Sequence, residues 1–464
     1  MKQKSFSLVK KGVVGLLCST IMLPSVVNSQ SLEQAVAFTF DTHPELRAAY
    51  TRFKVSEKQV DQAEAGYWPT IDATAGIGYE HTDSPSTRRS TPDGDETEDL
   101  IRRELGLSLK QELFSGFHTR SEVDRTSYAT TAEQWRLYSA SEDLALEVSK
   151  VYIDLIKAEK LVALSEKNLV AHEEIFEQIK QRTDSGFGSS ADLSQINGRL
   201  AKAHSNLIAA NNNFLDSKVT FYRIIEQRPD NLVIPYPDNS MLPKTEEDGL
   251  QFALKNHPVV KSAAADIQSA KAQYGAAKSS YYPKVSFDLN TNFNDNLDGE
   301  DGSGTPDVGG ENNEVVAMIR LSYNIFSGGK DDAYAKETAY KMSEAKELNR
   351  NVHRQVTEGF ILSWNAFEQL NFQKRYIKMH VIASKDTRSN YKEQFKIGQR
   401  SLLDLLDTEN ELYQARRDFL DAEFTEISAQ YRILHAMGLL VKSLRVTRPS
   451  SWLGEKQFDG GVAQ

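Results

Sequence analysis

Cysteine is almost absent from this sequence, since Cys18 is the only one among 464 residues. A single thiol forms no intramolecular disulfide and supplies no cysteine-based metal site. Cys18 also lies in an N-terminal segment with the pattern of a secretory signal, which the mature chain would lose. We therefore expect a mature fold that contains neither a disulfide nor a free thiol.

The N-terminal segment has the three parts of a signal peptide. Several lysines precede an apolar core over residues 12–23, and small residues follow up to Ser29. This pattern predicts a signal peptide over residues 1–29. The alternative is a lipid anchor on Cys18, and Leu17 disfavours it because a small residue is required before a lipidated cysteine.

An excess of positive charge and long apolar runs are also missing. The formal net charge is −10, which argues against a nucleic-acid partner. Outside the N-terminal segment, no apolar run reaches the roughly 18 residues of a membrane-spanning helix. No Ser/His/Asp or Cys/His arrangement can be placed, so we predict no enzyme, no cofactor and no metal centre.

One polar segment imitates part of a calcium-binding loop. Asn294, Asn296, Asp298 and Gly299 have the spacing of its front half, but position twelve is Thr305 instead of glutamate. A flexible loop over residues 294–313 is the favoured interpretation, and weak surface binding of calcium is left open.

What the sequence does contain is an internal repeat built on heptads. The stretch FKIGQRSLLDLLDTENEL at 395–412 is echoed 212 residues earlier, at 187–200. Apolar or small residues then return every seven positions in both copies. A strict seven-residue repeat predicts supercoiled helices. An amphipathic helix on a globular core, with a period nearer 3.6, is the alternative. The first column of each copy reads Leu193, Leu200, Leu207, Phe214, Phe221 and Leu405, Leu412, Phe419, Glu426, Ile433.

Each repeat also contains a proline-free helix of unusual length. Residues 119–183 would form a rod of about 100 Å, and the second repeat follows the same course from 330 to 438. Shorter helices precede the strands of each repeat, over 31–66 and 250–275, and a His-Pro pair interrupts each of them near its start.

The hydrophobic period changes to two in four places. Alternating apolar residues run from Ile71 to Tyr79 and from Val285 to Phe293, and closing runs follow at 105–109 and 315–325. Such alternation predicts strands with one apolar and one wet face. Polar loops are expected between them, over 80–99 and 294–313.

Four strands per chain are too few for a membrane barrel. A sheet in lipid must close, because unpaired edge groups would find no water there. Copies of the chain must therefore share one barrel. Three copies supply twelve strands and an open interior, whereas two supply eight, which side chains would fill.

The predicted organisation has five parts. A signal peptide over 1–29 precedes a first repeat over 30–227, a proline-bearing connector over 228–248 and a second repeat over 249–440. A polar tail over 441–464 ends the chain and is expected to fray.

These features together resemble the TolC family of outer-membrane export ducts. The resemblance rests on the signal peptide, the two repeats and the tip sequence GQRSLLDLLD at 398–407, and it covers nearly the whole mature chain. It implies an α+β membrane protein: a trimeric twelve-stranded β-barrel continued by a long α-helical coiled-coil tunnel. The duct would lie in the outer membrane, contact its lipid and extend into the periplasm.

The resemblance also implies partners and a cargo. A periplasmic adaptor and an inner-membrane ABC or proton-driven transporter would complete the export system, with the chain as a homotrimer. Within the family, the sequence resembles the type I secretion branch that exports large adhesins. Small-molecule efflux is the alternative, and a periplasmic coiled-coil scaffold without a pore is a third hypothesis.

Site residues follow from the resemblance position by position. Asp404 and Asp407 match the acidic rings that narrow the tunnel and favour cations, and Arg400 and Asp192 match a latch between helices. The latch tyrosine is Phe395 here and a threonine is replaced by Ala191, so two hydrogen bonds of the closed entrance cannot form. Independently, two carboxylates three residues apart share a helix face, and threefold symmetry would gather six of them. A solvated charged tip is the alternative.

Overall fold

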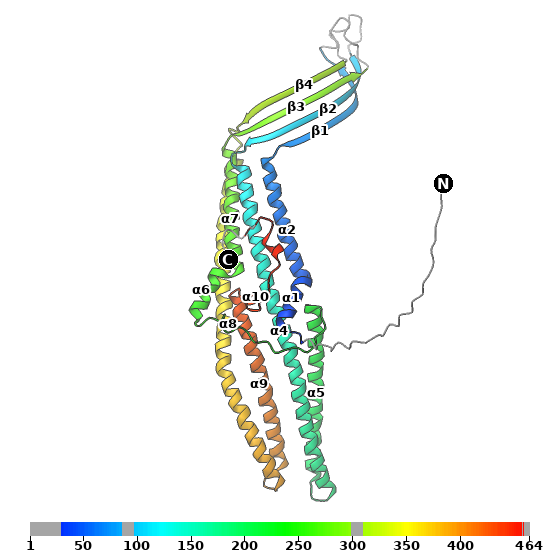
Figure 1. The fold of residues 1–464 in the computed structure, drawn as a ribbon, viewed down its shortest axis with the longest axis vertical. Helices are drawn as coiled ribbons and strands as arrows, with labels where there is room; N and C mark the ends of the chain where they lie inside the picture. The colour runs from blue at the N-terminus through cyan, green and yellow to red at the C-terminus, as the bar shows by residue number, and fades with distance from the viewer. Residues whose placement is uncertain (1–28, 86–96, 298–309, 457, 459–464) are drawn as a thin grey trace, which may run out of the picture.

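A computed structural model describes residues 29–85, 97–297, 310–456 and 458. The chain is an elongated rod of helices with a curved sheet at one end (Figure 1). The first repeat contains α1 (Leu32–Thr42), α2 (Pro44–Glu64), β1 (Thr70–Asp83), β2 (Thr97–Phe114), α4 (His118–Asp184) and α5 (Ser190–Ile225). The second contains α6 (Glu246–Asn256), α7 (Pro258–Ala277), β3 (Lys284–Leu297), β4 (Gly310–Ser322), α8 (Lys330–Lys396) and α9 (Leu402–Ala436), followed by α10 (Leu440–Ser443). The described residues also form three short 3-10 helices, at Ala65–Tyr67, Lys278–Tyr281 and Ser450–Leu453.

The interruption predicted at each His-Pro pair is confirmed. Proline stands at the first position of α2 and of α7, where its missing N–H costs no hydrogen bond. The second-repeat helix α6 begins at Glu246, inside the predicted connector. Thr245 caps it through the N–H of Asp248, and three acidic residues occupy its first turn, where the helix dipole favours them.

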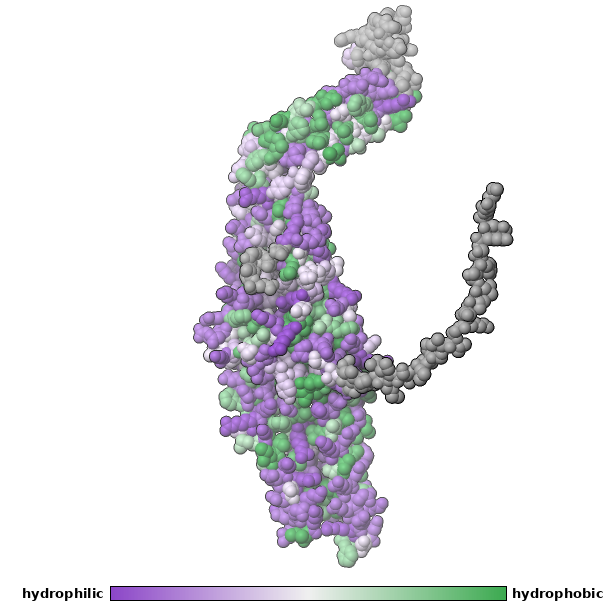
Figure 2. Space-filling model, viewed as in Figure 1, coloured by the Kyte–Doolittle hydropathy of each residue, from purple (hydrophilic) through white to green (hydrophobic). Residues whose placement is uncertain are grey.

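The four strands form one antiparallel sheet in the order β1-β2-β3-β4. Its register places apolar residues beside one another on one face, for example Ala75 beside Leu105 and Leu105 beside Phe293. Figure 2 shows hydrophobic residues gathered over the sheet, whereas the helical body is mostly hydrophilic. The sheet therefore exposes an apolar face, as the alternation predicts.

The predicted loops at 80–99 and 294–313 are too long. The strands continue through polar residues to Asp83 and Leu297, and they resume at Thr97 and Gly310. Backbone pairing does not require apolar side chains, and polar contacts support this part of the sheet: Arg102 pairs with Glu80 at 2.8 Å. Residues 86–96 and 298–309, which include most of the calcium-like segment, lie outside the described residues.

The last apolar run is shorter than predicted, because β4 ends at Ser322 and not at Ile325. The side chain of Asn324 accepts a hydrogen bond from the N–H of Phe326 at 3.2 Å. This local turn competes with the sheet ladder and ends the strand.

The long helices form two antiparallel hairpins that point away from the sheet. α4 and α8 have 67 residues each, which corresponds to about 100 Å, and they return through α5 and α9. A second heptad column, three residues after the first, is buried in α9 at Ala415, Ala422 and Ala429, whereas Ala436 at the end of the helix is half-buried. The predicted coiled-coil rods are confirmed in length. The first column is only partly buried, since Leu412 is buried and Phe419 is half-buried.

The main core lies at mid-height, where α1, α2, α4, α9, α10 and the connector meet. The connector crosses the helices as predicted: the hydroxyl of Tyr152 on α4 accepts from the N–H of Val233 at 3.0 Å and donates to the carbonyl of Gln30 at 2.7 Å. This core fixes where the two repeats meet.

The prediction that the tail frays is wrong for residues 441–456 and 458. Trp452 is buried, with its ring centroid 6.0 Å from Phe40 and 6.4 Å from Tyr138. Gln134 of α4 donates to the carbonyl of Trp452 at 2.8 Å. Widely spaced aromatic residues in a polar segment thus anchor it to the core.

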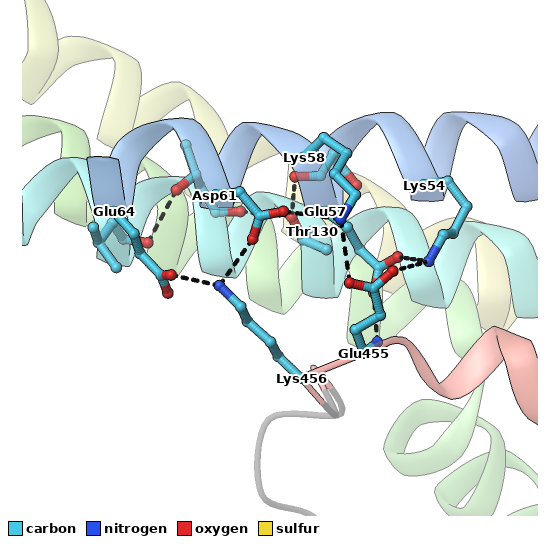
Figure 3. A network of polar contacts seen from close by, with 11 residues as sticks. Lys54, Glu57, Lys58, Asp61, Glu64, Thr130, Glu455 and Lys456 are labelled. Atoms are coloured by element: carbon cyan, nitrogen blue, oxygen red, sulfur yellow. Dashed lines mark hydrogen bonds and ion pairs between the residues drawn. The ribbon is translucent and has the colours of Figure 1, made fainter. Parts of the chain in front are cut away.

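A polar network completes the docking of the tail on α2 (Figure 3). Lys456 pairs with Asp61 at 3.1 Å and with Glu64 at 2.6 Å. The buried Glu57 accepts from the backbone N–H of Glu455 at 2.8 Å. The tail therefore joins the end of the second repeat to the first.

Within the described ranges, no helix is both long enough and apolar enough to cross a membrane.

Candidate functional site at the helical tip

The two hairpin turns lie together at the end of the rod farthest from the sheet (Figure 1). Gly186 and Gly398 occupy equivalent positions in these turns, with φ of +78° and +77°. Only glycine adopts this backbone conformation without strain. The echo between the two tip sequences is therefore confirmed as a pair of matching turns.

An apolar cluster joins the two hairpins just above the turns. We call it the tip cluster, and it contains buried residues from α4, α5, α8 and α9. Phe395 belongs to it and is buried, and the guanidinium of Arg182 lies 4.9 Å above its ring. The ring therefore makes a cation–π contact between α8 and α4. The cluster consists of Ile175, Ile179, Ile196, Phe395, Leu402, Leu405 and Leu406.

Asp404 has a local structural task. Its carboxylate accepts from the backbone N–H of Ser401 at 3.3 Å, and the Ser401 hydroxyl accepts from the N–H of Asp404 at 3.2 Å. This reciprocal capping box stabilises the start of α9. Nη1 of Arg400 lies 3.9 Å from the same carboxylate, so the guanidinium partly balances its charge.

Asp407 pairs with a residue that the sequence analysis did not single out. Nη2 of Arg199 on α5 lies 2.8 Å from Oδ1 of Asp407 on α9. The pair connects the two hairpins at the level of the tip cluster. Arg199 is seven residues after Asp192, and that spacing on one helix face was the only sequence signal for it.

The predicted latch residues do not meet within one chain. Arg400 donates to Gln394 at 3.0 Å and lies 4.3 Å above the ring of Tyr391, both on α8. Asp192 is half-buried and makes no ion pair or side-chain hydrogen bond among the described residues. The assignment of Arg400, Asp192 and Phe395 as a latch stays a prediction about the assembled protein.

Other charged contacts support the tip. Lys392 of α8 lies 3.7 Å from Glu174 of α4, which adds a second polar bridge between hairpins. Arg388 pairs with Glu409, whose side chain is buried. A buried carboxylate needs such a partner, because it has lost its water.

The tip exposes both charged and apolar side chains. In the part of the chain that the structure describes, no three histidine, cysteine or acidic residues are grouped to hold a metal ion. Phe187 of the first turn is 90% exposed, and Ile397 and Leu403 at the second turn are exposed as well. The tip is therefore suited to contacts with other proteins.

Comparison with known proteins extends over both repeats. The family model "Outer membrane efflux protein" matches residues 40–226 and 249–439. The chain is 22% identical over 423 residues to the outer membrane efflux protein BepC of Brucella suis, covering 91% of this chain and 88% of BepC. It is 21% identical over 422 residues to the outer membrane protein TolC of Vibrio cholerae, covering 90% and 93%.

Solved structures show the same fold. The outer membrane protein VceC of Vibrio cholerae superposes with a TM-score of 0.74 at 16% identity, covering 88% of this chain and 96% of VceC. The CmeC outer membrane channel of Campylobacter jejuni gives 0.75 at 15% identity, covering 88% and 86%. The predicted fold class, with four strands per chain and a long helical coiled coil, is confirmed.

Proposed function

The chain belongs to the outer membrane efflux protein family, and from this membership we propose that it forms the outer-membrane exit duct of a three-part export system. It is an outer-membrane channel protein and not an enzyme. The observation that carries the proposal is the joining of an apolar-faced sheet to hairpins of about 100 Å. The sheet suits lipid, and the hairpins reach far into the periplasm.

We propose a homotrimer in which three sheets close into one barrel. The edge strands β1 and β4 each have one unpaired side within a single chain, and closure satisfies both. Exposed apolar residues on α5, such as Ile208 and Val219, match a similar stripe on α8 that includes Tyr376 and Ile382. Packing α5 of one copy on α8 of the next would cover both stripes.

The tip is the proposed docking site for a periplasmic adaptor, which would connect the duct to an inner-membrane ABC or proton-driven transporter. Phe187, Ile397 and Leu403 support this proposal because they expose apolar surface at the end of an otherwise charged rod. Replacing Phe187 and Ile397 with serine should abolish cross-linking to the adaptor while the trimer stays intact. Unchanged cross-linking would contradict this placement.

Two cargo classes are proposed. Type I secretion of a large adhesin follows from the resemblance of the sequence. Efflux of small molecules is favoured by the printed names of relatives, such as the antibiotic efflux pump protein ArpC of Pseudomonas putida. Deleting the gene distinguishes them: loss of a giant protein from the cell surface supports secretion, and increased sensitivity to dyes and antibiotics supports efflux.

Asp404 and Asp407 are the proposed cation-selective ring. Threefold symmetry would bring six carboxylates around one axis, where like charges attract cations. Asparagine at both positions removes the charge and retains an acceptor for the capping box. The double variant should lose most of its preference for cations in a planar bilayer. Asp184→Asn, at the tip but outside the ring, is the matched control, and equal selectivity of all three proteins would contradict the assignment.

A further inference from the structure

An ion pair between the two hairpins neutralises one of the two tip carboxylates. Arg199 and Asp407 come from different hairpins, and their side chains are 28% and 58% exposed. Asp407 directly follows Leu406, and Arg199 lies three residues after Ile196, and both of these apolar residues are fully buried in the tip cluster. The ion pair therefore lies next to the part of the tip cluster that α5 and α9 contribute.

Separating α5 from α9 must break both contacts together. Residues three apart on a helix share one face, so Ile196 and Arg199 leave the partner helix in one movement. The apolar contact then exposes surface, and the ion pair releases a carboxylate. Before that movement, Asp404 has Arg400 nearby and Asp407 has Arg199. Both carboxylates of the proposed ring thus have a cationic partner in this structure.

We propose that Arg199 is a specificity-determining residue that neutralises Asp407 in the closed tip and releases it when the hairpins part. The inference rests on the proposed duct and deepens its gate. Cation selectivity is then a property of the open tip, because Asp407 joins the acidic ring only after α5 and α9 separate. Arg199 is distinct from Arg400, whose contacts lie within its own hairpin.

The size of the effect follows from the exposure of the pair. An exposed ion pair changes a conformational equilibrium by about threefold. Three subunits that open together multiply this factor, so losing all three pairs favours the open tip by roughly 30-fold. Removing Arg199 also removes three positive charges from the entrance. Both effects raise the preference for cations.

The test is single-channel recording of the full-length trimer in a planar bilayer with a potassium chloride gradient. Arg199→Gln should raise both the conductance and the ratio of potassium to chloride permeability, whereas Arg199→Lys should resemble the wild type. Asp407→Asn breaks the same pair but removes the carboxylate, so conductance should rise while cation preference falls. These opposite changes in selectivity separate charge compensation from simple loosening of the tip.

The exchanged pair Arg199→Asp with Asp407→Arg restores the attraction and should return conductance to near the wild-type value. The matched control is Lys157→Gln, which breaks another ion pair between the hairpins, with Asp421, away from the tip. It should leave selectivity unchanged. If Arg199→Gln fails to assemble, the exchanged pair and Arg199→Lys still test the proposal.

Different results would overturn the proposed duct and the proposed role of Arg199. Absence of any conductance from the wild-type trimer would overturn the duct itself. A conducting wild type whose selectivity equals that of Arg199→Gln would overturn the role of Arg199 and leave the duct intact. A failure of the exchanged pair to lower conductance below that of Arg199→Gln would also overturn it.

Discussion

Acidification should loosen the start of α7 through one histidine. His257 is 7% exposed and stands at the N-cap of α7, where its Nδ1 accepts from the N–H of Val259 at 3.3 Å. The ring of His435 lies 6.3 Å away, and His435 itself contacts Asp143 at 2.8 Å. A neutral imidazole suits this place, since it accepts a hydrogen bond at the positive end of a helix.

Burial, together with the nearby His435, lowers the pKa of His257 from 6.5 to about 4, and Asp143 only partly opposes them. The locally unfolded form, with an ordinary pKa of 6.5, binds the proton first as pH falls. The native contact is therefore fully stable above pH 6.5 and loses stability as pH falls through 6.5 towards 4. The full difference is about 3 kcal/mol, and about 1.4 kcal/mol is lost by pH 5.5.

Hydrogen exchange measured by mass spectrometry tests this locally. The peptide that contains Val259 should lose protection by about tenfold between pH 7.5 and 5.5, after correction for intrinsic exchange. His257→Asn supplies an N-cap acceptor that does not titrate, so its protection should not change. If the asparagine variant shows the same loss as the wild type, another group causes it and our reasoning about His257 is refuted.

Two further predictions concern the docked tail. Gly454→Ala should cost about 2 kcal/mol and speed proteolysis of the tail, because φ is +80° and the new Cβ would lie 2.6 Å from Oε1 of Glu57; Gly198→Ala, in open space, is the control. Arg448→Met should cost about 3 kcal/mol in thermal unfolding, since Arg448 pairs at 2.7 Å with Glu142, which is 1% exposed. Adding Glu142→Gln should recover most of that loss; a midpoint that stays low would contradict it.

The repeat architecture was predictable from local pattern because its signals are local. Heptads specify long helices, alternation specifies strands, and the His-Pro pairs mark where helices stop. The tail was not predictable in this way. Trp452 and Phe458 bury themselves against residues that lie more than 300 positions earlier, such as Gln134 and Thr131. Periodicity within a short polar segment does not predict contacts with residues so far away in the sequence.

At the tip, too, the sequence predicted the positions of the residues but not their contacts. The sequence located Asp404 and Asp407 at a helix start, and the structure places them there. Their partners depend on how two hairpins lie against each other, which composition and spacing do not specify. Asp404 forms a capping box with Ser401 at the start of its own helix, whereas Asp407 forms an ion pair with Arg199 on α5. Two carboxylates that look equivalent in sequence therefore make different contacts: Asp404 caps its own helix, and Asp407 forms an ion pair with another helix.

Internal symmetry makes the Arg199 contact more informative. Shifting by the 212-residue repeat, Arg199 corresponds to Glu411 and Asp407 to Gln195. Exchanging the repeats would thus replace the ion pair with a glutamate beside a glutamine. Glu411 instead lies 3.3 Å from His380 on α8. The pair is made once per chain, at the meeting of α5 and α9, so the two hairpins are not interchangeable. The internal repeat therefore does not duplicate the ion pair between α5 and α9, and the two helices contribute different charges to the tip.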